Sequence, residues 1–257
     1  MRWESTGGVA LVTLDNPGRR NAIDAALAAG LADACDAIDA DATIGAAVLR
    51  GAEGYFCSGG DRDELAEISA APVSDAGMSA TQRIYDAFLR VGRLLVPTIA
   101  AVRGGAVGAG VNLALAADVR VVADDAVLAS GFTRLGVHPG GGHFALLNRF
   151  AGPQAAAALG VFGETVDGAS AVRLGLAYDS VPDDQVEDRA LALAQVAGKD
   201  PALARATIKS LRTEAGPPAV SWPAAVALEQ SVQPWSFARK GGPGWSARGE
   251  RGDGRSR

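Results

Sequence analysis

Short apolar runs of about five residues alternate along the chain with longer stretches in which apolar residues recur every three or four positions. The short runs are typical of buried strands, and the longer periodic stretches indicate helices. Trp3 is expected in a hairpin partner of the first strand, across Gly7–Gly8. Strands are predicted at Val9–Leu14, Ala46–Arg50, Thr98–Val102, Val119–Ala123, Ala126–Ala129 and Tyr178–Val181.

The helical pattern fills most of the chain between these strands. Strands that alternate with helices predict an α/β fold of β-α units with right-handed crossovers. Residues 70–80 and 130–142 read as loops. Helices are predicted at Ala25–Ala40, Asp63–Ile68, Thr81–Leu95, Val111–Ala117, His143–Phe150, Pro153–Phe162, Gly168–Gly175, Asp184–Gly198, Pro201–Ala215 and Ala219–Gln233.

Two glycine-rich segments interrupt this pattern directly after strands. In Pro97–Asp118 a strand leads through Gly104, Gly105, Gly108, Ala109 and Gly110 into an apolar helix. Small residues let a ligand approach the backbone, and the first N–H groups of a helix lack internal partners. Such a turn suits an anion or an oxyanion. The segment Tyr55–Leu65 repeats the arrangement, so one backbone donor from each could meet one carbonyl oxygen.

Composition narrows the class of protein. Of the 257 residues, 48% are hydrophobic and 21% are charged, as in ordinary globular proteins, and the net charge of −5 argues against nucleic acid as a partner. Cys35 and Cys57 alone suggest no disulfide framework. With no signal pattern at the N-terminus and no apolar run of about 20 residues, a cytoplasmic protein without a membrane partner is expected. The glycine- and arginine-rich tail, 236–257, is predicted to be disordered.

Three motifs in order resemble the crotonase (enoyl-CoA hydratase/isomerase) superfamily. They are Phe56-Cys57-Ser58-Gly59-Gly60-Asp61, the block from Ala101 to Gly110, and Leu135-Gly136 through Gly142. The resemblance implies a ClpP/crotonase-like spiral of β-β-α units with C-terminal helices that form a homotrimer or a dimer of trimers. It implies a core domain at 1–198, a helical region at 199–235 and the tail at 236–257.

The resemblance also implies an acyl-CoA thioester as substrate, in fatty acid metabolism, with no cofactor besides its coenzyme A and no metal. The N–H groups of Ser58 and Ala109 would form an oxyanion hole. Arg19 and Arg20 would meet the CoA phosphates, although two solvated arginines in a loop remain the alternative. The loop at 70–80 is expected either to border the acyl pocket or to be an uninvolved surface loop. Further substrate contacts are expected from Ala22, Cys57, Gly59, Asp61, Gly108, Phe132 and His143.

The two glutamates that family hydratases use are absent. Their positions carry Asn112 and Phe132, and neither side chain transfers a proton near neutral pH. In some relatives an acidic residue eight positions further on does this work, and Gly140 stands there. His138 is the foremost candidate proton carrier, ahead of His143, although both could be structural. Arg62 and Arg134 could bind a malonyl-type carboxylate or lie on the surface.

The sequence therefore predicts an enzyme that stabilises a thioester enolate without two-glutamate hydration. Isomerisation, decarboxylation and C–C bond cleavage all remain open, and Asn112 could donate a hydrogen bond to the enolate. The alternative is an acyl-CoA-binding or assembly protein that keeps the fold without catalysis.

Overall fold

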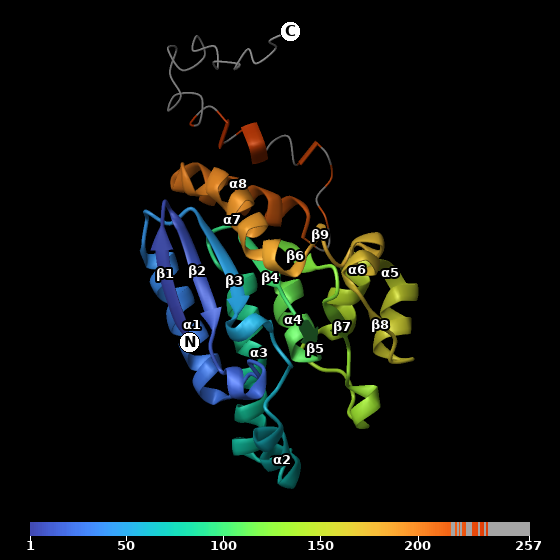
Figure 1. Cartoon of the computed structure of the whole chain (residues 1–257). Coiled ribbons are helices and arrows are strands. Elements are labelled where there is room, and N and C mark those ends of the chain that lie inside the picture. Colours follow the sequence, from blue (N-terminus) through green and yellow to red (C-terminus); the bar gives the residue numbers. More distant parts are fainter. Residues whose placement is uncertain are drawn as a thin grey trace. The chain divides into compact units, whose positions relative to one another are not determined.

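A computed structural model of the chain describes residues 1–216, 219, 221, 223–224, 228–230, 232–233 and 235 (Figure 1). The strands are β1 Arg2–Thr6, β2 Val9–Leu14, β3 Ala46–Gly51, β4 Thr98–Val102, β5 Gly105–Val107, β6 Val119–Ala123, β7 Val127–Ala129, β8 Thr165–Val166 and β9 Asp179–Val181. The helices are α1 Ala25–Ala40, α2 Arg62–Ala70, α3 Asp75–Gly92, α4 Ala109–Ala116, α5 His143–Gly160, α6 Gly168–Leu174, α7 Val186–Gly198 and α8 Pro201–Glu214.

The larger sheet has the strand order β1-β2-β3-β4-β6-β9. Only the β1–β2 hairpin is antiparallel, with Trp3 opposite Val12 as the sequence predicted. The other four pairs are parallel, which requires a crossover between each pair. A smaller sheet joins β5, β7 and β8. Neither β5 nor β8 was predicted, because β5 lies within the glycine-rich segment and β8 has only two residues.

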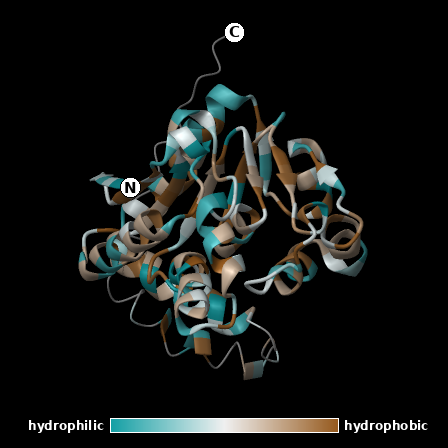
Figure 2. Ribbon diagram, turned by 90° about the horizontal axis from the view of Figure 1, so that it is seen from below, coloured by the Kyte–Doolittle hydropathy of each residue, from teal (hydrophilic) through white to brown (hydrophobic). Residues whose placement is uncertain are grey.

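The parallel strands β2, β3 and β4 are buried, largely apolar runs without alternation, as is typical of a sheet that helices cover on both faces. Helix α7 packs across β2, β3, β4 and β6, while α1 contacts β2 and α4 contacts β6. Every residue of β4 is buried. In Figure 2 the hydrophobic segments run along strands in the interior, and hydrophilic residues occur mainly on the surrounding helices.

Helix α3 begins earlier than predicted and corrects the expected loop at 70–80. Ser74 caps it, since its side-chain oxygen accepts a hydrogen bond from the Gly77 N–H at 3.1 Å. Residues from Asp75 onward are therefore helical, and the connection from α2 is short. The two helices predicted at His143–Phe150 and Pro153–Phe162 correspond to the two parts of α5, which are separated by non-helical backbone at Gly152 directly before Pro153.

The contacts divide the chain into two compact units, Met1–Arg205 and Ala206–Arg257. The tail predicted to be disordered, 236–257, and most of the helix predicted at Ala219–Gln233 lie outside the described residues. No helix among the residues described is both long and apolar enough to span a bilayer. The site lies within the first unit.

Candidate active site

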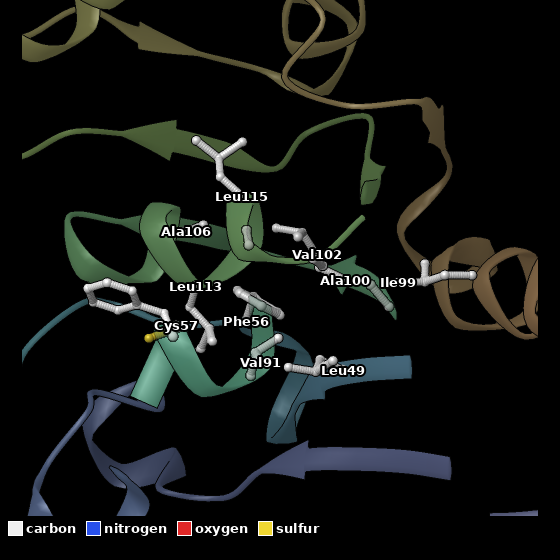
Figure 3. Packing of buried hydrophobic residues seen from close by; sticks show 14 of the residues in the cluster. Leu49, Phe56, Cys57, Val91, Ile99, Ala100, Val102, Ala106, Leu113 and Leu115 are labelled. Carbon is white, nitrogen blue, oxygen red and sulfur yellow. The ribbon is translucent and has the colours of Figure 1, made fainter. Parts of the chain in front are cut away.

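The two glycine-rich segments predicted to converge do lie against each other. Cys57 pairs with Ala106 of β5 through hydrogen bonds from its own N–H to the Gly105 carbonyl and from the Val107 N–H to its carbonyl. A Cβ on Gly110 would lie 2.2 Å from the Cys57 carbonyl oxygen, so only glycine lets α4 pack this closely on the loop. Figure 3 shows Phe56 and Cys57 beside Leu113 of α4 in this packing.

The N–H of Ala109 is one free donor of the site. Ala109 is the first residue of α4, and its N–H has no acceptor in the described part of the chain. The Gly108 carbonyl, in the same peptide unit, accepts hydrogen bonds from Val111 and Asn112. Because a trans peptide points its C=O and N–H in opposite directions, the Ala109 N–H points out of the helix start. This geometry is consistent with the donor role predicted for it.

Ser58 does not offer the second donor. Its N–H already donates to the Arg20 carbonyl at 3.0 Å, and its hydroxyl donates to the Arg19 carbonyl at 2.9 Å. The prediction of Ser58 as an oxyanion donor is therefore wrong for this conformation. Both groups instead fasten the loop to the segment that precedes α1.

Gly60 offers the donor instead. The Gly59 carbonyl accepts from the Ile23 N–H at 2.7 Å, so the N–H of Gly60 in the same peptide unit points away from Ile23. That N–H has no acceptor among the described residues. Gly59 lies close to the other donor, since a Cβ built on it would be 3.5 Å from the Ala109 nitrogen. The sequence motif contained Gly60 but could not say which of its amides faces outward.

A cavity of about 410 Å³ collects many of the predicted binding residues. Its lining comes from two segments, the turn before α1 and the loop that leads into α2. The residues are Gly18, Arg19, Arg20, Ala22, Ser58, Gly60, Asp61 and Arg62. The sequence expected Arg62 and Arg134 as a possible pair for a carboxylate, but only Arg62 lines this cavity, and Arg134 lies on an exposed turn at Thr133–Leu135.

Arg19 and Arg20, two of the three arginines that line this cavity, differ in their partners. The Arg19 guanidinium pairs with Asp61 at 2.8 Å and with Asp63 at 2.6 Å, whereas Arg20 lies over the Tyr55 ring at 5.4 Å. Burial would raise the pKa of Asp61, but hydrogen bonds from the Glu64 N–H, Arg19 and the Asp63 N–H lower it overall. Asp61 therefore acts as a charged anchor. Arg20 has no acidic partner among the described residues, so it is the better placed of the two for phosphate.

Asn112, where the resemblance leads one to expect a glutamate, belongs to a buried hydrogen-bonded chain. The Asn112 Nδ2 donates to the Gly140 carbonyl at 3.0 Å, and its Oδ1 lies 2.7 Å from His143 Nδ1. Since the Gly140 carbonyl can only accept, Asn112 Oδ1 must accept the proton of His143 Nδ1. The Nε2 then accepts from the Ser130 hydroxyl at 2.6 Å. Ser130 was not predicted, because only the fold brings it to His143.

His143 is held neutral within this chain. Burial lowers its pKa from 6.5 to about 4, because the charged imidazolium is poorly solvated there. Phe132, at the other position where the resemblance leads one to expect a glutamate, packs its ring edge-on to His143 at 5.0 Å between centroids. A Cβ on Gly108 would lie 3.7 Å from the Phe132 ring, so this ring also borders the start of α4.

The histidine ranked first by sequence lies elsewhere. His138 is exposed, and its Nδ1 contacts the carbonyl of the next residue, Pro139, at 2.7 Å. His143 rather than His138 is therefore linked to Asn112. The Cys57 side chain is buried, and burial raises the pKa of its thiol to about 12. The substrate contact expected from Cys57 stays a prediction. Within the described residues, no cluster of acidic, histidine or cysteine side chains is arranged to bind a metal ion.

Comparison with known proteins agrees with this fold. The sequence profile of the enoyl-CoA hydratase/isomerase family matches residues 4–238. The crystal structure of an enoyl-CoA hydratase from Bacillus anthracis superposes with a TM-score of 0.82 at 26% identity, covering 91% of this chain and 89% of that one. The chain therefore belongs to the enoyl-CoA hydratase/isomerase family and has the crotonase fold.

Particular relatives carry different activities in their names. "Probable enoyl-CoA hydratase EchA14" from Mycobacterium tuberculosis is 46% identical over 178 residues, which cover 69% of this chain and 68% of that protein. The 1,2-epoxyphenylacetyl-CoA isomerase of Escherichia coli is 34% identical over 79% of this chain and 77% of its own length. The similarity thus extends to proteins named as hydratases and as isomerases.

Proposed function

We propose that this protein binds an acyl-CoA thioester, places its carbonyl oxygen between the N–H groups of Ala109 and Gly60, and stabilises the enolate that forms there. The observation that supports this most directly is the pair of unpartnered backbone donors on two segments that pack together. Preorganised donors of this kind stabilise developing negative charge without reorganisation. The arginine-lined cavity beside Gly60 suits the phosphates of coenzyme A.

The reaction is isomerisation, decarboxylation or C–C bond cleavage rather than simple hydration. Hydration by two carboxylates needs a general acid and a general base, and each contributes about 10²–10⁴-fold. Asn112 and Phe132 supply neither, and both oxygen and nitrogen of the Asn112 amide already engage His143 and Gly140. The amide keeps one N–H for the substrate. This supports a reaction whose main requirement is enolate stabilisation.

Three probes distinguish these reactions. Crotonyl-CoA should lose its conjugated absorbance far more slowly than the roughly 10³ per second at the top of the common enzyme range. Butyryl-CoA in D2O should gain deuterium at its α-carbon, and malonyl-CoA should yield acetyl-CoA if decarboxylation is supported. Fast hydration of crotonyl-CoA would contradict the proposal that the reaction is not simple hydration.

The oxyanion hole is tested by Ala109→Pro. Proline is tolerated at the first position of a helix, so α4 should persist while the donor is lost. The conversion rate should fall by about 10²–10³-fold. Ala109→Ser is the matched control, because it keeps the N–H. If wild-type protein binds acyl-CoA yet converts none of the probes, the alternative of a non-catalytic acyl-CoA-binding protein replaces this proposal.

A further inference from the structure

The hydroxyl of Tyr85 occupies the space that a side chain at position 140 would otherwise fill. Tyr85 belongs to α3, and a Cβ built on Gly140 would lie only 2.3 Å from its hydroxyl oxygen. The neighbouring Phe88 reaches the same turn, since a Cβ on Gly141 would lie 2.4 Å from its ring. Glycine at these two positions lets the two aromatic side chains of α3 approach the backbone of the turn before α5.

This hydroxyl has no hydrogen-bond partner among the residues that the structure describes. The Tyr85 side chain is half-buried, and its ring packs on Phe88 with centroids 5.9 Å apart. The Asn112, His143 and Ser130 side chains nearby are all engaged with one another. Tyr85 therefore brings an unengaged O–H to this turn, beside an Asn112 amide that keeps one N–H.

The Tyr85 hydroxyl is connected to the helix that carries the Ala109 donor through Gly140 and Asn112. Gly140, over which it lies, accepts the hydrogen bond from Asn112, and Asn112 follows Ala109 by one turn of α4. The hydroxyl can reach the α-carbon of a bound acyl group only if that group, held at its carbonyl oxygen by Ala109 and Gly60, extends along this turn. A phenol is a proton donor as well as an acceptor, unlike Asn112 and Phe132.

We infer that Tyr85 is a catalytic residue that donates a proton to the α-carbon of the bound enolate. This inference rests on the proposed enolate function. In that step the Tyr85 O–H bond breaks, a C–H bond forms with the electron pair of the enolate, and the phenolate regains a proton from water. By microscopic reversibility, the phenolate removes the same α-proton in the reverse direction.

Exchange of the α-protons of butyryl-CoA in D2O tests this role, with deuterium measured by mass spectrometry. Tyr85→Phe keeps the ring on Phe88 and removes only the hydroxyl, so it should lower exchange by about 10²–10⁴-fold with little change in butyryl-CoA binding. Tyr178→Phe, at an exposed position outside the site, is the matched control and should exchange like wild type.

A second variant, at Gly140, tests whether the position of the Tyr85 hydroxyl matters for exchange. Gly140→Ala places a methyl group against the Tyr85 hydroxyl, so it should slow exchange in wild type but add little to Tyr85→Phe. Equal exchange in wild type and Tyr85→Phe would overturn the role of Tyr85 alone, leaving the enolate function in place. Malonyl-CoA turnover without butyryl-CoA exchange in wild type would also overturn it. If wild-type protein converts none of the probes, both the role of Tyr85 and the enolate function are overturned.

Discussion

The imidazole of His143 is buried among Asn112, Ser130 and Phe132, and burial lowers its pKa from 6.5 to about 4. The unfolded chain therefore binds a proton at a higher pH than the folded protein does. Between about pH 6.5 and pH 4, each fall in pH favours the unfolded state. Protonation of this imidazole therefore makes the free energy of unfolding depend on pH.

We expect the free energy of unfolding to fall by about 3 kcal/mol from this group as pH drops from 6.5 to 4. His143→Gln should flatten that part of the pH dependence, whatever it does to stability at neutral pH. His138→Gln, at the exposed histidine, should leave the profile as in wild type. Urea unfolding across this pH range measures it, and parallel slopes for wild type and His143→Gln would contradict the expectation.

At the level of elements, Asp61 joins the start of α2 to the turn before α1. Its carboxylate caps α2 by accepting from the Asp63 and Glu64 N–H groups at 3.0 and 3.2 Å, and it pairs with Arg19. Its side chain is buried. This one carboxylate therefore holds together both segments that line the arginine-rich cavity.

Asp61→Ala should lower the free energy of unfolding by about 1–2 kcal/mol, because it removes a helix cap together with a partly buried ion pair. The control is Asp63→Ala, since Asp63 also pairs with Arg19 but is 74% exposed. An exposed pair contributes about 0–1 kcal/mol. Urea denaturation compares the two variants. Equal losses would mean that the cap contributes nothing beyond the ion pair.

For the whole molecule, assembly remains a prediction based on the resemblance of the C-terminal helices to the subunit-contacting helices of the family. Helix α8 leaves Leu203 and Leu211 exposed at 38% and 54%. Apolar side chains of this kind are covered in symmetric oligomers. The expected species is a trimer or a dimer of trimers.

Light scattering coupled to size-exclusion chromatography tests assembly at micromolar protein concentration. A trimer of this 26.0 kDa chain has a mass of about 78 kDa. Leu211→Glu should shift the population towards smaller species, whereas Lys209→Glu controls for an added acid on the same helix. A wild-type monomer at these concentrations would contradict the prediction.

Much of the fold was readable from the chain alone. Strands such as β2, β4 and β6 were predicted with their observed bounds, because five or six buried residues between turn signals leave a clear pattern. The convergence of the two glycine-rich segments also followed from their similar patterns. Helix α3 was placed too late, since its first turn reads as a loop until Ser74 is seen to cap it.

The tertiary structure decided which atoms of the motifs face outward. The sequence does not distinguish the N–H groups of Ser58 and Gly60 as donors. In the structure, the Ser58 N–H donates to the Arg20 carbonyl, whereas the Gly60 N–H points away from Ile23 and has no acceptor among the described residues. His143 rather than His138 is linked to Asn112, because the hydrogen-bonded chain from Gly140 through Asn112 and His143 to Ser130 forms only in three dimensions. Tyr85 reaches Gly140 from a helix 55 residues earlier in the sequence. Local pattern determines strands and turns, whereas hydrogen-bond direction and long-range contact depend on packing.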